Sequence, residues 1–92
     1  MGRKHKSVWD ALENTQEDAA NMRARAELMI ALQKSVERNK GTQEAKAEAL
    51  GITQPRLNDL LRGRIEKFSI DALVNIASRA GLRVDLKVRR AA

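Results

Sequence analysis

The stretch TQEAKAEALGITQPRLNDLLRGR, residues 42–64, decides the fold of this chain. It predicts two short helices joined by a tight turn. The first helix is expected over Gln43–Leu50 and ends at Gly51, because the residue just past a helix often needs the left-handed conformation that glycine adopts freely. Thr53 offers an N-cap hydroxyl to the second helix. Pro55 fits the first turn of that helix, where a missing N–H has no consequence.

The second helix has an apolar side and a polar side. Leu57, Leu60 and Leu61 recur at helical spacing and predict the buried side, before Gly63 ends the helix. Polar side chains are left for the other faces. Two helices across a glycine turn, the second with an exposed polar N-terminal half, form a helix-turn-helix unit, whose second helix enters the major groove of DNA.

Base contacts are expected from the first two turns of this helix. The candidates are Gln54, Pro55, Arg56, Asn58 and Asp59. The planar guanidinium of Arg56 matches O6 and N7 of guanine, and Asn58 can contact a base or a phosphate. Asp59 can accept from a cytosine amino group, or it can pair with Arg62 or Arg56.

Phosphate contacts are expected from residues at the helix N-termini and around the end of the second helix. Backbone N–H groups at a helix N-terminus attract anions, and basic side chains neutralise phosphates. The candidates are Gln43, Thr53, Arg62, Arg64 and Lys67. The alternative interpretation is a solvated polar face without a ligand.

Composition restricts the remaining classes of function. The chain has 92 residues, no cysteine, one histidine (His5) and a net charge of +6. Without cysteine, and with a single histidine, neither a zinc site nor a histidine-based catalytic triad can be assembled, so we expect no enzyme and no cofactor. The only aromatic residues, Trp9 and Phe68, disfavour a single-strand binder that stacks bases. The longest apolar run, 28–32, is too short to span a membrane, so we expect a soluble cytoplasmic protein associated with the nucleoid.

One domain is expected over 7–92, after a flexible basic arm at 1–6 that either contacts phosphates or is simply solvated. A short helix is expected over 7–12 and a long one over 16–38. The buried side of the long helix is indicated by Leu28, Leu32 and Val36. A connector at 65–68 then leads to a helix over 70–80, capped by Ser69 and ended by Gly81.

The last residues of the chain show a different repeat of apolar and polar side chains. Residues 82–88 alternate apolar and polar side chains, which predicts a half-buried strand. A lone strand cannot pair its backbone groups within one chain, so we expect it to pair with the same strand of a second molecule. The alternative is an extended tail on the helices. The residues assigned to the dimer strand are Leu82, Val84, Leu86 and Val88.

The motifs of this chain resemble a known family. They are TQ at 42–43, Ala47, LGI at 50–52, TQPRLNDLLRG at 53–63 and FSIDAL at 68–73. Together they resemble the XRE-type (phage-repressor-like) helix-turn-helix family, and within it small antitoxins of HigA type. The resemblance covers residues 7–88. It implies an all-α, lambda-repressor-like domain of four to five helices with one C-terminal strand that pairs across a homodimer.

The resemblance also implies a function. Such proteins repress their own operon as dimers on a palindromic operator of double-stranded DNA, and they bind a small RNase toxin. The family's DNA-facing positions fall on Gln43, Gln54, Pro55, Arg56, Asn58 and Asp59. An alternative from another class is a protein-interaction module that mainly masks a partner protein and binds DNA weakly or not at all. Its partner surface would be the amphipathic segment 7–38, unless that segment packs within its own dimer.

Overall fold

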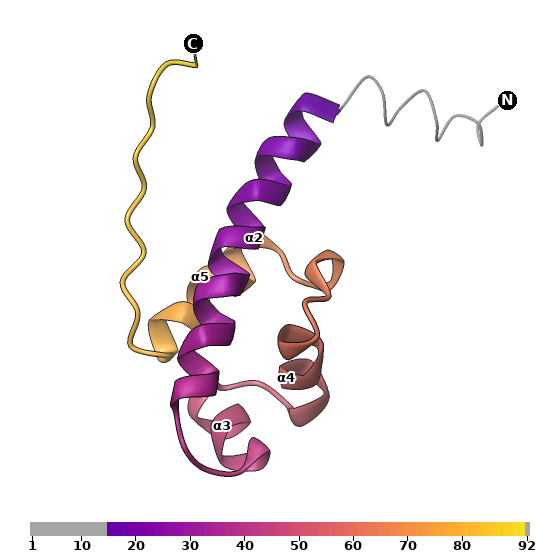
Figure 1. The fold of residues 1–92 in the computed structure, drawn as a ribbon, viewed down its shortest axis with the longest axis vertical. Coiled ribbons are helices and arrows are strands. Elements are labelled where there is room, and N and C mark those ends of the chain that lie inside the picture. The colour runs from indigo at the N-terminus through magenta and orange to yellow at the C-terminus, as the bar shows by residue number, and fades with distance from the viewer. Residues whose placement is uncertain (1–14, 92) are drawn as a thin grey trace, which may run out of the picture.

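A computed structural model describes residues 15–91, which form four α-helices and one 3₁₀ turn (Figure 1). In chain order the elements are α2 (Thr15–Arg38), α3 (Gln43–Leu50), α4 (Gln54–Leu61), η1 (Ile65–Lys67) and α5 (Ile70–Arg79). The expected all-α class is confirmed for this part of the chain, and α2, α3 and α5 begin and end within one residue of the expected positions. The predicted arm at 1–6 and the predicted helix at 7–12 lie outside the described residues.

Helix α2 is the longest element, and α4 and α5 pack against it, whereas α3 packs on α4 and α5 (Figure 1). Its C-terminal half buries Met29, Leu32 and Val36, which lie at helical spacing on one side. Residues 16–23 are exposed, so the first turns of α2 extend beyond the core. The helix therefore offers a free surface in addition to its structural role.

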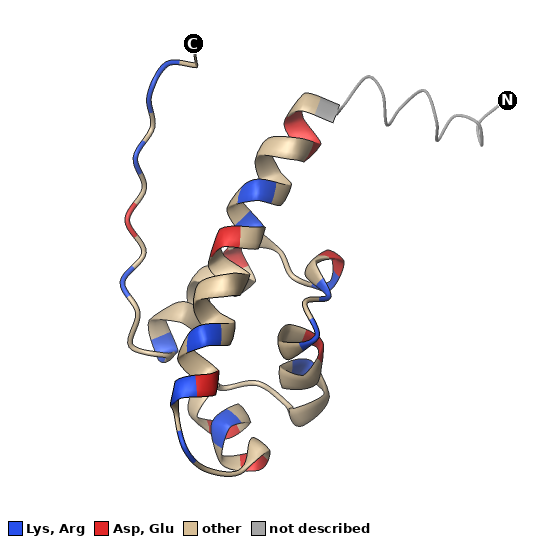
Figure 2. Ribbon diagram, viewed as in Figure 1, with Lys and Arg blue, Asp and Glu red and all other residues tan. Residues whose placement is uncertain are grey.

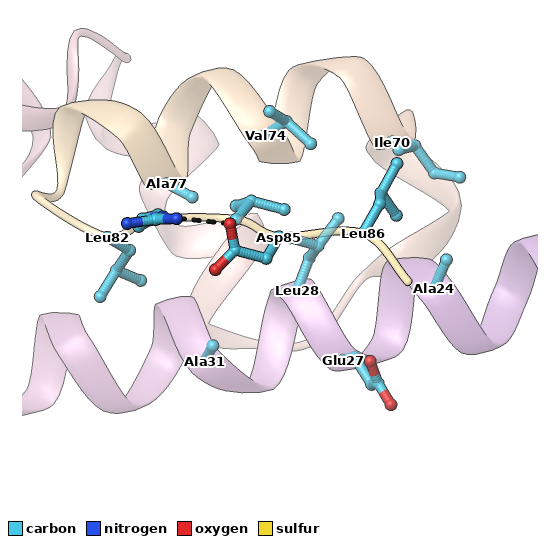
Figure 3. Close-up of a pocket in the computed structure, with 12 residues that line it drawn as sticks. Ala24, Glu27, Leu28, Ala31, Ile70, Val74, Ala77, Leu82, Asp85 and Leu86 are labelled. Carbon is cyan, nitrogen blue, oxygen red and sulfur yellow. Dashed lines mark hydrogen bonds and ion pairs between the residues drawn. The ribbon is translucent and has the colours of Figure 1, made fainter. Parts of the chain in front are cut away.

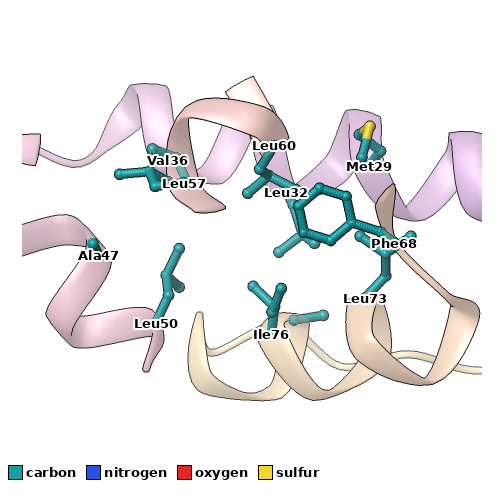
Figure 4. Packing of buried hydrophobic residues seen from close by; sticks show 11 residues of the cluster. Met29, Leu32, Val36, Ala47, Leu50, Leu57, Leu60, Phe68, Leu73 and Ile76 are labelled. Carbon is teal, nitrogen blue, oxygen red and sulfur yellow. The ribbon is translucent and has the colours of Figure 1, made fainter. Parts of the chain in front are cut away.

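The hydrophobic core lies where α2, α4 and α5 meet (Figure 4). Its most deeply buried side chains are Leu32, Leu57, Leu60, Phe68 and Leu73. Burying a side chain of this size contributes about 1.5–3 kcal/mol. Because Leu57 and Leu60 anchor the inner side of α4, the opposite side of that helix is held toward solvent.

The predicted caps Thr53 and Ser69 and the predicted glycine turn at Gly51 are present, and Thr42 caps α3 in the same way. Thr42, Thr53 and Ser69 each have extended backbone, and each accepts a side-chain hydrogen bond from the N–H three residues ahead, at 3.0, 3.2 and 3.1 Å. Gly51 has φ 71°, and its N–H donates to the carbonyl of Glu48 at 3.0 Å. The path from α3 into α4 is therefore set by local hydrogen bonds as well as by the core.

The predicted C-terminal strand is not seen within the described residues 15–91 of the single chain. After Gly81 the chain runs extended beside α2 and α5 without a hydrogen-bonded ladder (Figure 1). Leu82 is half-buried, and its N–H donates to the carbonyl of Ala77 at 2.9 Å. Val84, Leu86 and Val88 are exposed, the last two almost fully. The physical reason is that a strand needs a neighbouring strand, and the described part of this chain supplies none.

None of the helices between residues 15 and 91 is long and apolar enough to cross a membrane.

Candidate nucleic-acid interface

The outer side of α4 carries most of the candidate base contacts. Gln54, Pro55 and Asn58 are exposed, whereas Leu57 and Leu60 are buried. Pro55 has no N–H, and the N–H groups of Arg56 and Leu57 donate to Oγ1 and to the carbonyl of Thr53, so the N–H of Gln54 is the one left at the open end of the helix. The geometry therefore presents amide side chains beside a positively polarised helix end.

The ten predicted contact residues divide into two groups by burial. Arg56 and Asp59 are half-buried, and the residues of the larger group are more exposed. Arg56 and Asp59 have side-chain partners within the chain, and in the larger group Arg64 pairs with Asp59 and Thr53 caps α4. The division matters because a side chain engaged in its own protein is less available to a ligand.

Arg56 is directed toward the connector between α4 and α5. Its Nη1 donates to the carbonyl of Lys67 at 2.8 Å, and its Cζ lies 4.2 Å from the centre of the Phe68 ring. A guanidinium stacked on an aromatic face and bonded to a carbonyl is held in one orientation. The sequence does indicate a functional arginine here, but it does not show this contact.

Asp59 has a partner that differs from the two expected ones. The expectation that it pairs with Arg62 or Arg56 is wrong, since its Oδ1 lies 3.7 Å from Nε of Arg64. Gly63, with φ 75°, turns the chain after the helix, and the N–H of Arg64 donates to the carbonyl of Asp59 at 3.0 Å. The turn therefore brings Arg64 back over the end of α4, beside Asp59.

The candidate phosphate contacts are all exposed. Gln43 opens α3, and Thr53 caps α4. The hydroxyl of Thr53 accepts the capping bond and keeps its own hydrogen free to donate. Arg62, Arg64 and Lys67 follow one another around the end of α4 and through the connector, where Figure 2 shows basic segments close together. Four basic residues and two acidic ones lie between residues 53 and 68, so this edge is net positive.

Two polar residues of α2 support this surface and could not be identified from the sequence. Gln33 Nε2 donates to the carbonyl of Leu60 at 2.9 Å, and this carbonyl in the last turn of α4 also accepts from the N–H of Gly63. Arg25 Nη1 donates to the carbonyl of Ile65 at 3.0 Å. Both residues lie four positions from Met29, at the edge of the buried stripe of α2. That position is the one sequence signal that points to them.

No group of three or more histidine, cysteine or carboxylate side chains suited to a metal ion occurs in the described part of the chain. The interface consists of hydrogen-bond donors, amides and positive charge around one exposed helix. Such an arrangement is suited to contacting the sugar-phosphate backbone and the base edges of a duplex.

Comparison with protein families agrees with this geometry. Residues 11–89 match the model of a family described as a helix-turn-helix domain. Among curated proteins, none matches the sequence closely enough to be reported as a relative. The family match covers most of the chain, including all five elements of the structure. The chain therefore belongs to the helix-turn-helix domain family.

Proposed function

We propose that this protein is a sequence-specific DNA-binding repressor that recognises a palindromic operator as a homodimer. The observation that carries the proposal is the outer side of α4, where Gln54, Pro55 and Asn58 are exposed beside a capped helix N-terminus. The leucines of the same helix fix it to the core, so the polar side is presented rigidly. A rigid, polar recognition helix is what base readout requires.

Selection of duplexes from a random pool by the purified protein tests this proposal. We expect enrichment of one sequence with two-fold symmetry and half-sites about 34 Å apart, one helical turn of DNA. Circular dichroism on the same preparation establishes that the protein is folded. A folded protein that enriches no sequence would rule out a sequence-specific regulator.

The dimer is proposed to form through the C-terminal tail, residues 82–91. An apolar groove of about 590 Å³ lies between α2, α5 and this tail (Figure 3). Leu28 and Val74 line it from the helices, and Leu82 and Leu86 from the tail. Groove and tail lie on the same face of one chain, so a two-fold axis beside them brings the same apolar surface of both copies together, as in an isologous interface.

Antiparallel pairing of two tails has one favoured register. Pairing centred on Val84 places Arg83 opposite Asp85 of the partner subunit, and the same ion pair is repeated across the axis. In the single chain, Arg83 Nε and Asp85 Oδ1 are 3.0 Å apart on the same side of the tail, both well exposed. Opposite charges on facing strands stabilise pairing, whereas pairing centred on Asp85 would place two carboxylates together.

Cysteine cross-linking tests the dimer, because the chain has no cysteine of its own. Directly opposed residues of an antiparallel pair lie within disulfide distance. We therefore expect V84C to form a covalent dimer under mild oxidation. V88C, four residues from the proposed axis, is the matched control and should cross-link much less. Equal cross-linking by both variants, or none by either, would contradict this register.

We also propose, more specifically, that this repressor is an antitoxin. Met22 and Ile30 are exposed large apolar side chains on α2, 42% and 51% accessible, and lie outside the core. We propose that this side of α2 binds a small RNase toxin encoded beside this gene. Co-expression with the product of the adjacent gene should restore growth, and M22D/I30D should abolish the rescue while leaving operator binding intact. Unchanged rescue by M22D/I30D would exclude this surface.

The same exposed residues favour a second candidate function, a module that mainly masks its partner. The two functions differ in the duplex selection described above, since a masking module would bind its partner protein and enrich no DNA sequence. In either case we propose a non-enzymatic protein that acts in the cytoplasm, and for the repressor at the nucleoid.

A further inference from the structure

Two arginines from different helices hold the connector between α4 and α5. From α4, Arg56 Nη1 donates to the carbonyl of Lys67 at 2.8 Å. From α2, Arg25 Nη1 donates to the carbonyls of Ile65 and Phe68 at 3.0 and 3.4 Å. We call Arg25, Arg56 and these three carbonyls the arginine clamp. The connector has three backbone hydrogen bonds of its own, from the N–H groups of Ile65, Lys67 and Phe68, and the clamp adds three from side chains of other elements.

Arg56 lies on the side of α4 next to the core. Residues four apart share a helix face, which pairs Arg56 with the fully buried Leu60 and pairs Gln54 with Asn58 on the outer side. The guanidinium lies over the ring of Phe68, itself only 2% exposed. Arg56 thus covers one end of the core and extends away from the amide side chains of the outer side.

Binding to guanine needs two parallel N–H groups of the guanidinium directed at one base edge. In Arg56, Nη1 is engaged by a backbone carbonyl, and one face of the group is stacked on Phe68. The edge that carries Nε–H and Nη2–H keeps its donors, but turning it toward a base in front of Gln54 and Asn58 requires the guanidinium to leave both Lys67 and Phe68. The connector, in contrast, carries the exposed Arg64 and Lys67, whose positions depend on where the clamp holds the backbone.

We propose that Arg56 is a positioning residue and not a base-contacting one: it fixes the connector so that Arg64 and Lys67 meet the DNA backbone. Base discrimination then comes from Gln54 and Asn58 on the outer side of α4. The proposal rests on the proposed DNA-binding function. It predicts that Arg25, on another helix, affects DNA binding in the same way, because both arginines act through one connector.

The experiment measures the affinity of wild type, R56Q and R25Q for the selected operator and for every single base-pair substitution of it. We expect both variants to bind the operator about tenfold more weakly, the effect of removing one charge-assisted hydrogen bond. The ratio of operator to substituted duplex should stay as in wild type at every position. The slope of log affinity against log salt should fall by about 0.9 for each phosphate that is no longer neutralised, in both variants.

Three further variants serve as controls. R23Q makes the same charge change on an exposed position of α2 and should leave affinity and discrimination unchanged. N58A should relax preference at one base pair, which shows that the assay detects the removal of a base-reading side chain. R56K keeps the charge and one donor, so it should recover part of the affinity and provides a stable variant if R56Q does not fold.

Amide exchange of the free protein gives a readout independent of DNA. The N–H groups of Lys67 and Phe68 donate within the connector at 3.0 and 3.2 Å. Loss of the clamp in R56Q or R25Q should accelerate exchange of these two amides relative to those of α3, with a smaller acceleration in R56K. Exchange at wild-type rates in these variants would overturn the positioning role.

The affinity results separate the two proposals. If wild type selects an operator and R56Q loses discrimination at one base pair while R25Q does not, Arg56 contacts that base and the positioning role is overturned, although DNA binding stands. If wild type is folded and binds no duplex, the proposed function itself fails, and the positioning role fails with it.

Discussion

The α3–α4 unit and the C-terminal tail differ in how their conformations are determined. Between residues 42 and 63, two threonine caps and two glycines with positive φ mark the four helix ends, and Leu57 and Leu60 join the core. In the tail, the alternation of residues 82–88 is as regular as any pattern in the sequence, yet Leu86 and Val88 are 89% and 90% exposed. The difference is that helices satisfy their backbone within one segment, whereas a strand requires another strand.

This difference suggests separate roles for the α3–α4 unit and the C-terminal tail. The α3–α4 unit has its shape in the single chain and can present a fixed surface to DNA. In the proposed dimer the tail acquires its final structure only with a second molecule, so its pairing would depend on protein concentration. Operator binding by a dimer would then depend on both regions. The α3–α4 unit would contact the DNA, and the paired tails would set the distance between the two recognition helices.

The largest difference in stability is expected between leucine-to-alanine substitutions in the two regions. Leu60 has 0% and Leu86 has 89% of its surface exposed. Because L60A leaves a cavity in the core, it should reduce the free energy of unfolding by about 2–5 kcal/mol. L86A should change it by less than about 0.5 kcal/mol. Urea denaturation at concentrations where the protein is monomeric measures both, and similar decreases would show that the tail is part of the monomer's core.

A smaller effect is expected at the turn between α3 and α4. Gly51 has φ 71°, and a Cβ there would lie 2.6 Å from Nη1 of Arg79. G51A should therefore destabilise the protein by about 1–2 kcal/mol through the left-handed conformation, with a further contribution from moving Arg79. G51N, whose side chain tolerates this conformation better, should recover part of the stability in thermal denaturation. Equal stability of wild type and G51A would contradict a conformational requirement for glycine.

Loss of the cap on α4 should have a still smaller effect. The hydroxyl of Thr53 accepts from the N–H of Arg56 at 3.2 Å. T53A should lower the free energy of unfolding by about 1 kcal/mol, and T53S, which retains the hydroxyl, should restore most of it. Chemical denaturation with both variants measures this. If T53S is as unstable as T53A, the methyl group and not the capping bond is responsible.

The smallest effect on the monomer is expected from removing the tail. Truncation after Arg83 keeps Leu82, whose N–H bonds to Ala77, and removes residues 84–92. The stability of the monomer should change by less than about 0.5 kcal/mol, while the proposed dimer no longer forms. Sedimentation velocity across a range of concentrations measures the second effect. A truncated protein that still forms dimers would place the interface elsewhere, with the exposed side of α2 as the next surface to test.

Much of the fold could be predicted from the sequence because its signals are local. Thr42, Thr53 and Ser69 mark three helix starts, and Gly51 and Gly81 mark two ends, each through hydrogen bonds or dihedral angles within a few residues. The repeat of Leu32 and Val36 on α2, like that of Leu57 and Leu60 on α4, identified the buried sides. The exposed part of the candidate interface followed from the same periodicity, since residues opposite a buried stripe face solvent.

The sequence by itself thus determined where the helices begin and end, which sides are buried, and that the outer side of α4 is polar. Only the tertiary structure decided that Arg56 contacts Phe68 and Lys67, that Asp59 pairs with Arg64, and that Arg25 and Gln33 support the surface from α2. The physical reason is range. Caps and helical periodicity act within one or two turns of the chain, whereas the partner of a long polar side chain is set by which distant backbone groups the packed core brings within its reach.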